Sequence, residues 1–292
     1  RVRADAVWQR LGIDGAGVTV AVVDSGVDYH HPLLTTRYRG YLPAGATPAN
    51  ALNWWCRIVD VLCSTRGLFP VDGLGHGTHV AGIILAGDGY GVAPGARWIA
   101  VRACAATACD ALPVLQGLEW LLELGDDRPD VLNASLTTRA EDALLFESVV
   151  ARLVAAGVVV VASTGNGDGV IGAPAMFRDV IGVGATTAAD ARWSGSRFQR
   201  TSFGWWKPDV VAPGAGVTST VPGGGFSRLT GTSMAAPHAS SVAALLRQAR
   251  PGLAPVAVRD VLTRTAVPVG AQAPANATGW GRVDAYAAVL AV

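Results

Sequence analysis

Short runs of apolar, mostly β-branched residues recur along the chain, and each run ends at a glycine or at a polar residue. Most of these runs are continuous rather than alternating, which is typical of strands that are covered on both faces of a sheet. The pattern predicts strands at 18–23, 98–102, 131–135, 158–162, 180–183 and 209–212.

Between the apolar runs lie segments whose apolar residues recur at helical spacing. They predict helices at 78–85, 112–123, 142–156, 232–247 and 256–265. The third of these is followed by Gly157, a residue suited to a helix C-terminus. Alternation of strands with helices indicates an α/β fold with a mainly parallel sheet. No linker divides the chain, so we expect one domain over residues 1–292.

Residues 35–75 fit the alternation poorly. They are rich in proline, glycine, asparagine and aromatic residues, and they include Trp54 and Trp55. The composition predicts a long insertion loop, and long ordered loops are more often functional than ornamental.

Composition narrows the class of protein. Half of the 292 residues are hydrophobic, 15% are charged, and the formal net charge is +1. This balance excludes a disordered chain, and it offers no basic field for nucleic acid. The longest nearly apolar stretches, such as 153–162, are far shorter than the roughly 20 residues that span a bilayer, so no membrane span is expected.

Four cysteines form two local pairs, Cys56 with Cys63 and Cys104 with Cys109. Their spacing lacks the paired C-x-x-C of a structural zinc site. Four cysteines allow three disulfide pairings, of which the local one is the simplest, and free buried thiols are the alternative. Disulfides would indicate an oxidising compartment.

Three polar residues stand where an apolar element begins or ends. Asp24 closes the first predicted strand, His76 lies in a Gly-His-Gly turn before a helix, and Ser233 lies before another helix. An acid, a base and a hydroxyl in these places meet the requirements of a catalytic triad, in which a carboxylate orients the imidazole that activates the serine. Taken singly, they would be a turn former, a loop residue and a helix cap. The order Asp, His, Ser is that of the subtilisin triad.

The segments VAVVDSGVD, GHGTHVAGI and GTSMAAPHAS resemble the three signature motifs of the subtilases, the subtilisin-like serine proteases. The resemblance runs from VWQRLGIDGAGVTVAVVD to GWGRVDAYAAV, which is nearly the whole chain. The segments HPLL, YRGY and GVAPGARWIAVRAC are most similar to the bacillopeptidase F-like branch. The resemblance implies a three-layer subtilisin-like fold with a mainly parallel central sheet flanked by helices.

The resemblance also implies roles for single residues. Ser233 matches the nucleophile, His76 the general base and acid, and Asp24 the orienting carboxylate. Asn166, in Ser-Thr-Gly-Asn, matches the oxyanion-hole asparagine, although on sequence alone it would be a turn residue. His79 and His238 match positions that are structural in the family.

By the same resemblance, an edge segment pairs with an extended substrate, and the opposite wall and a glycine floor complete the first substrate pocket. Thr137 replaces the usual glycine of the edge segment, and no acid is evident in the pocket, so we expect apolar or medium-sized side chains before the cut. A Cys104–Cys109 disulfide would stiffen a loop beside the fourth pocket, or would simply staple that loop. The matching substrate-binding residues are Ser135, Leu136, Thr137, Ala162, Ser163, Thr164, Gly165 and Gly172.

The family's tight calcium site draws on an Asp after His-Pro and on a long polar loop. Here Leu33 follows His-Pro and the 82–91 segment is short, so we expect that site to be absent; calcium near Asp168 or Asp190 stays open. No metal ligand or cofactor is assigned to catalysis. The resemblance implies a secreted, monomeric endopeptidase, made as a zymogen, whose partners are protein or peptide substrates and its own propeptide.

Two other functions remain to be weighed. A non-catalytic relative of the family would have lost a triad residue, whereas Asp24, His76, Asn166 and Ser233 are all present. An esterase of the α/β-hydrolase class needs a G-x-S-x-G elbow and the order Ser, acid, His. Neither is found here, so the protease is the favoured hypothesis.

Overall fold

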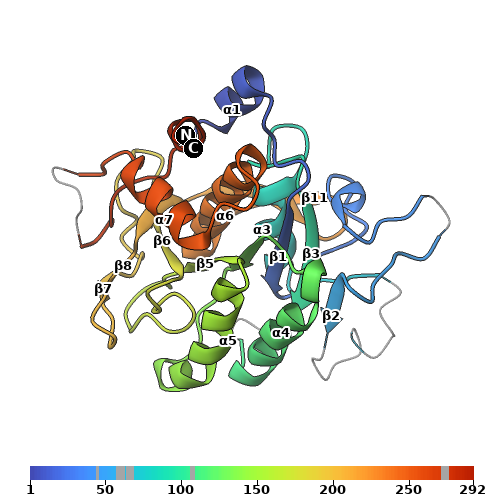
Figure 1. Cartoon of the computed structure of the whole chain (residues 1–292), viewed down its shortest axis with the longest axis horizontal. Coiled ribbons are helices and arrows are strands. Elements are labelled where there is room, and N and C mark those ends of the chain that lie inside the picture. Colours follow the sequence, from blue (N-terminus) through green and yellow to red (C-terminus); the bar gives the residue numbers. More distant parts are fainter. Residues whose placement is uncertain (44–45, 57–62, 64–68, 106–108, 271–275) are drawn as a thin grey trace.

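The structure, a computed structural model, describes residues 1–292 except 44–45, 57–62, 64–68, 106–108 and 271–275. Within the described chain, seven parallel strands form a central sheet in the order β2-β3-β1-β4-β5-β6-β9 (Figure 1). The strands are β1 (Thr19–Asp24), β2 (Trp54–Cys56), β3 (Arg97–Arg102), β4 (Val131–Ala134), β5 (Val159–Ser163), β6 (Ile181–Thr186) and β9 (Val210–Pro213).

Helices cover both faces of the sheet, so the predicted three-layer α/β architecture is confirmed (Figure 1). One face carries α1 (Ala4–Leu11), α3 (His76–Leu85), α6 (Thr232–Ala249), α7 (Pro255–Arg264) and α8 (Ala285–Leu290). The other carries α4 (Ala111–Glu123) and α5 (Ala143–Ala155). No helix in the part of the chain that the structure describes combines the length and apolarity needed to cross a membrane.

Strand β1 shows why the apolar runs are continuous. Val20 and Val22 pack into the core beneath α3 and α6, whereas Ala21 and Val23 pack into the second core, beneath α4 and α5. All four side chains are fully buried. Because successive side chains of a strand point to opposite faces, a sheet with helices on both sides demands apolar residues at every position.

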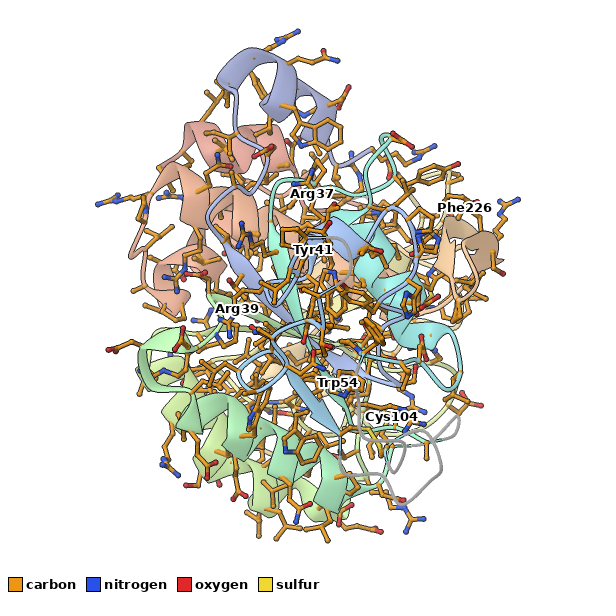
Figure 2. All side chains as sticks on the ribbon, turned by 90° about the vertical axis from the view of Figure 1, so that its right-hand side faces the viewer. Arg37, Arg39, Tyr41, Trp54, Cys104 and Phe226 are labelled. Carbon is orange, nitrogen blue, oxygen red and sulfur yellow. A yellow bond between two sulfur atoms is a disulfide. The ribbon has the colours of Figure 1, made fainter. Side chains whose placement is uncertain are left out.

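The structure also contains elements that the apolar pattern does not predict. The three residues of β2 pair with β3 at the sheet edge, with Trp54 opposite Ala100, so the 35–75 region is more than an inserted loop (Figure 2). Parts of that region, 57–62 and 64–68, lie outside the described residues. Helices α1 and α8 are also additional, as are two small hairpins: β7 (Gln199–Arg200) with β8 (Trp206–Lys207), and β10 (Val217–Val221) with β11 (Gly225–Leu229).

The single lysine of the chain, Lys207, is buried in this framework at 1% exposure. Its Nζ donates to the Val180 carbonyl oxygen and to Asp209 Oδ2, both at 2.5 Å. Asp209 Oδ2 also accepts the Gly182 N–H at 2.7 Å, so the buried ion pair joins β6 to the segment before β9. A buried charge needs such partners, because an unpaired one is costly to desolvate.

Candidate active site

The predicted catalytic residues meet at the carboxyl ends of the central strands. Parallel strands deliver their following segments to one edge of the sheet, where sites of α/β proteins usually form. A cleft of about 490 Å³ opens there. Its lining consists of Asp24, Ser25, Leu74, His76, Cys104, Cys109, Ser135, Leu136, Thr137, Ser163, Gly165, Asn166, Arg197, Thr232 and Ser233.

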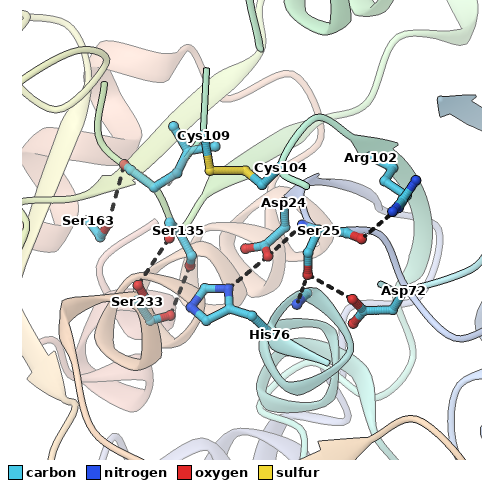
Figure 3. Close-up of a disulfide and its surroundings, with 12 residues drawn as sticks. Asp24, Ser25, Asp72, His76, Arg102, Cys104, Cys109, Ser135, Ser163 and Ser233 are labelled. Atoms are coloured by element: carbon cyan, nitrogen blue, oxygen red, sulfur yellow. Dashed lines mark hydrogen bonds and ion pairs between the residues drawn. A yellow bond between two sulfur atoms is a disulfide. The ribbon is translucent and has the colours of Figure 1, made fainter. Parts of the chain in front are cut away.

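Asp24 and His76 form a close pair. Asp24 is 2% exposed at the end of β1, and its Oδ1 lies 2.7 Å from His76 Nδ1 on α3 (Figure 3). A carboxylate can only accept a hydrogen bond, so Nδ1 of His76 carries the proton and Nε2 of the neutral ring has a free lone pair. Burial lowers the pKa of His76, but the charge and hydrogen bond of Asp24, together with the charge of Asp72, raise that pKa above its ordinary value.

Asp72 holds the start of α3 in place. Its Oδ1 accepts the N–H of Gly75 at 2.8 Å and the hydroxyl of Ser25 at 2.8 Å, and its Oδ2 accepts the N–H and the hydroxyl of Thr78 at 2.8 and 2.6 Å. The first N–H groups of a helix have no partner within the helix, so an acceptor outside it must satisfy them. Asp72 therefore fixes the turn from which His76 projects.

Ser233 stands in the first turn of α6, tied to the segment after β4. Its Oγ donates to the Ser135 carbonyl oxygen at 3.0 Å, and Ser135 Oγ donates to the Ser233 carbonyl oxygen at 2.9 Å (Figure 3). That carbonyl is available because Pro237, four residues later in α6, has no N–H to bond it. The His76 ring lies between Ser233 and Asp24, although Ser233 Oγ is bonded to Ser135 and not to His76. Catalytic hydrogen bonds often close only when substrate binds.

Asn166 follows β5 with its amide held by Thr232. Asn166 Oδ1 accepts both the N–H and the hydroxyl of Thr232 at 2.9 Å. Thr232 Oγ1 in turn accepts the Gly165 N–H at 3.1 Å. Since the oxygen of the side-chain amide is occupied, Nδ2 is the group left to donate to a ligand in the cleft.

Comparison with known proteins identifies the family of this chain. The model of the subtilase family, Peptidase S8, matches residues 15–281. The chain belongs to the subtilase family. Bacillopeptidase F of Bacillus subtilis (strain 168) is 36% identical over 318 aligned residues, which is all of this chain and 22% of that protein. Subtilisin Savinase of Lederbergia lenta is 37% identical over 294 residues, 99% of this chain and 96% of that protein.

A crystal structure of a cold adapted subtilisin-like serine proteinase superposes with a TM-score of 0.72 and 28% identity, covering 93% of this chain and 88% of that one. The subtilase is thus a serine endopeptidase of the subtilisin type by sequence and by fold.

The residues predicted to bind substrate fall into two groups. Ser135, Leu136, Thr137, Ser163 and Gly165 line the cleft, as does Asn166. The other three lie outside that lining. Ala162 packs into the core beneath α4 and α5, since strand residues alternate between faces. Buried Thr164 donates to the carbonyl oxygens of Val183 and Arg197.

Gly172 lies against the segment after β4. Its N–H donates to Thr137 Oγ1 at 3.2 Å, and a Cβ at Gly172 would come within 1.9 Å of the Thr138 carbonyl oxygen. The space beside the predicted pocket floor is therefore filled by the Thr138 backbone and by Oγ1 of Thr137, which would lie 2.9 Å from that Cβ.

Both local cysteine pairs are joined in the structure. Cys104 bonds Cys109 and Cys56 bonds Cys63, so the structure contains no free cysteine among its described residues. Cys104 and Cys109 line the cleft. Arg102, 1% exposed, donates from Nη1 to Cys63 Sγ at 3.0 Å and from Nε to the Ser25 carbonyl oxygen at 3.2 Å, which links the other disulfide to the segment behind Asp24.

Two other histidines lie apart from the predicted catalytic residues, His79 fully buried and His238 half-buried. His79 Nε2 lies 3.1 Å from the Ser227 carbonyl oxygen, and His238 Nδ1 lies 2.8 Å from the Met234 carbonyl oxygen. Burial lowers the pKa of both rings, that of His238 to about 4. Each is therefore neutral at pH 7.

Two segments match the family's calcium position, one at Leu33 and one in the short loop after α3. Leu33 packs against the apolar core, and the Gly91 N–H bonds the Ala86 carbonyl oxygen and closes the short loop on itself. Calcium takes six to eight oxygens. Among the described residues, no group of three or more His, Cys, Asp or Glu side chains could hold a metal.

Sequence reasoning missed several residues that shape the cleft. Asp72 carried a usable signal, an acidic residue shortly before a helix start. Thr232 stands inside a motif that predicts no role for it, and Arg197 belongs to no motif. Only tertiary structure brings Arg197 to the cleft.

Proposed function

We propose that the subtilase cleaves peptide bonds through Asp24, His76 and Ser233 and an acyl-enzyme on Ser233. The observation that carries this proposal is the 2.7 Å hydrogen bond from His76 Nδ1 to Asp24 Oδ1, in the cleft that also holds Ser233 and Asn166. It leaves His76 Nε2 as the base on the side of Ser233.

In the first half of the reaction, His76 Nε2 takes the proton of Ser233 Oγ as that oxygen attacks the scissile carbonyl. The new oxyanion accepts hydrogen bonds from Asn166 Nδ2 and from the Ser233 backbone N–H at the start of α6. The imidazolium gives its proton to the leaving amine, and the peptide C–N bond breaks. A water then attacks the ester by the same route and releases the acid and free Ser233.

A pocket for apolar or medium-sized side chains before the cut is supported by two observations. Asp24 is the acidic residue among those lining the cleft, and its Oδ1 is already bonded to His76 and to the Ser25 N–H. Thr137 and Thr138 fill the space beside Gly172. Such a pocket offers neither a partner for Arg or Lys nor depth for the largest rings.

Labelling and cleavage assays test the mechanism. A fluorophosphonate should label Ser233 in the folded protein, and neither Ser233→Ala nor heat-unfolded protein should be labelled. Labelling that persists in Ser233→Ala would disprove the assignment. In a peptide library, Thr137→Gly should widen acceptance toward larger side chains before the cut, and selectivity for Arg or Lys in the unchanged protein would refute the pocket.

We also propose that the domain is secreted, acts as a monomer after release from a prosegment and needs no cofactor for catalysis. Two disulfides support an oxidising compartment. Light scattering should give the mass of one chain, and activity toward a peptide should be unchanged by EDTA. A dimer, or activity that returns only with added metal, would overturn the corresponding part.

A further inference from the structure

Arg197 brings a guanidinium group to the wall of the cleft, and that group is bonded to one turn of the backbone. Its Nε donates to the Gly167 carbonyl oxygen at 3.2 Å, its Nη2 to that of Asp168 at 2.8 Å and its Nη1 to that of Val170 at 2.9 Å. All three nitrogens are thus engaged within four residues of chain. The turn begins directly after Asn166, the residue assigned to the oxyanion hole.

The turn is shaped to fit the guanidinium. Gly165 and Gly169 have φ angles of +95° and +127°, in the region that favours glycine. A Cβ at Gly165 would lie 2.9 Å from Arg197 Nη1, and one at Gly169 would lie 3.0 Å from Nη2. These glycines let the backbone approach the group closely, but glycine-rich backbone has much conformational freedom to lose. Something must therefore hold the turn.

Other contacts hold only the first part of the turn. Arg197 N–H donates to the Gly165 carbonyl oxygen at 3.1 Å, and Gly167 N–H donates to that of Gly195 at 2.8 Å. Among the described residues, the carbonyl oxygens of Gly167, Asp168 and Val170 receive hydrogen bonds from the Arg197 side chain alone. Removing the Arg197 side chain would therefore remove the hydrogen bonds that hold residues 167–170.

We propose that Arg197 is a positioning residue for the oxyanion hole: its guanidinium fixes the 167–170 turn and so keeps Asn166 Nδ2 aimed at the transition state. The proposal rests on the proposed function, in which Asn166 binds the oxyanion. Oxyanion donors act through geometry, and a misplacement of about 1 Å can cost on the order of 10²-fold in rate.

A kinetic comparison of Arg197→Ala with the unchanged protein tests the role. We expect kcat to fall by roughly 10-fold to 100-fold and KM to change little, because the loss falls on the transition state. In an Asn166→Ala background the same change should cost almost nothing more, since its target is already gone. Guanidinium ion added at low, non-denaturing concentration should restore part of kcat to Arg197→Ala.

Arg39 supplies a matched control. Its guanidinium also bonds backbone carbonyl oxygens, those of Leu52 and Asp127, but away from the cleft (Figure 2). Arg39→Ala should leave kcat unchanged and should not respond to guanidinium. Should Arg197→Ala fail to fold, Arg197→Lys serves instead. Lysine keeps the charge, but its compact ammonium lacks the planar, spread-out donors of the guanidinium that match these three carbonyl oxygens, so kcat should still fall.

Three results would overturn the proposal. They are an Arg197→Ala kcat equal to that of the unchanged protein, an equal fold-loss in the Asn166→Ala background, and an effect confined to KM for substrates with acidic side chains. The last would make Arg197 a substrate contact. Failure of the proposed function is distinguishable, because then Asn166→Ala and Ser233→Ala would themselves leave activity intact.

Discussion

Replacing His238 should make the folded subtilase less sensitive to acid. The half-buried ring lies in the first turns of α6, where its Nδ1 is 2.8 Å from the Met234 carbonyl oxygen. Burial is the main cause that lowers the pKa of His238 to about 4; the Met234 hydrogen bond opposes it, and the charges of the chain's amino terminus and of His79 add to it. In the unfolded chain the ring has an ordinary pKa of about 6.5.

The magnitude follows from these two values. Between about pH 6.5 and about pH 4 the unfolded state binds a proton at His238 that the folded state does not bind. The free energy of unfolding therefore falls as the pH falls through this window. At about 1.36 kcal/mol for each unit of pKa, the full loss is about 3 kcal/mol by pH 4. Above the window the contribution is constant.

Urea unfolding, followed by tryptophan fluorescence across this pH range, measures the effect. All variants carry Ser233→Ala, so that self-cleavage does not distort the curves. His238→Gln should lose about 3 kcal/mol less between pH 7 and pH 4 than its parent. The absolute free energy of unfolding of His238→Gln does not affect this test, because only its change between pH 7 and pH 4 is compared with that of the parent. Equal slopes for His238→Gln and its parent would refute the reasoning.

Asp72→Asn removes a charge that raises the pKa of His76, so the acid limb of kcat/KM should move to lower pH; a shift to higher pH would contradict this reasoning. Thr232→Val removes the hydroxyl that donates to Asn166 Oδ1, and kcat should fall by about 10-fold or more in steady-state assays, toward the ~10²–10³ that follows loss of a whole oxyanion donor. An unchanged kcat would show that the hydroxyl does not orient the amide. Replacing both residues of the Cys104–Cys109 disulfide by serine should lower the free energy of unfolding by about 2 kcal/mol, measured with urea, and a loss near zero would contradict the loop-closure estimate.

The fold was largely predictable from local pattern because its sheet is buried on both faces. The apolar runs that became β1, β3, β4, β5, β6 and β9 carry their own signal, and so do the periodic segments that became α3 to α7. Strand β2 does not, since it has only three residues and is a strand only because β3 offers it an edge. Its tryptophans lie in a stretch whose prolines and glycines predict a loop.

The candidate site, too, could be predicted only in part from the sequence. Asp24, His76, Asn166 and Ser233 could be chosen because each stands in a motif, and the structure brings them into one cleft. The residues that hold them in place, Thr232 and Arg197, could not be predicted. A threonine that orients an amide or an arginine that bonds three carbonyl oxygens looks ordinary in sequence. Alternation along β5 likewise decides that Ser163 reaches the cleft while Ala162 turns into the core.

The burial of Lys207 gives the folded domain an unusual reactivity toward reagents that modify amines. Every other basic side chain is arginine or histidine, so the native protein presents no side-chain amine to solvent. Amine-selective acylating reagents and dialdehydes should find no lysine to modify in the native protein, and they would reach the Lys207 amine when the joint between β6 and β9 opens. A single acylated lysine, counted by mass spectrometry over time, would thus serve as a clock for the opening of one defined part of the sheet.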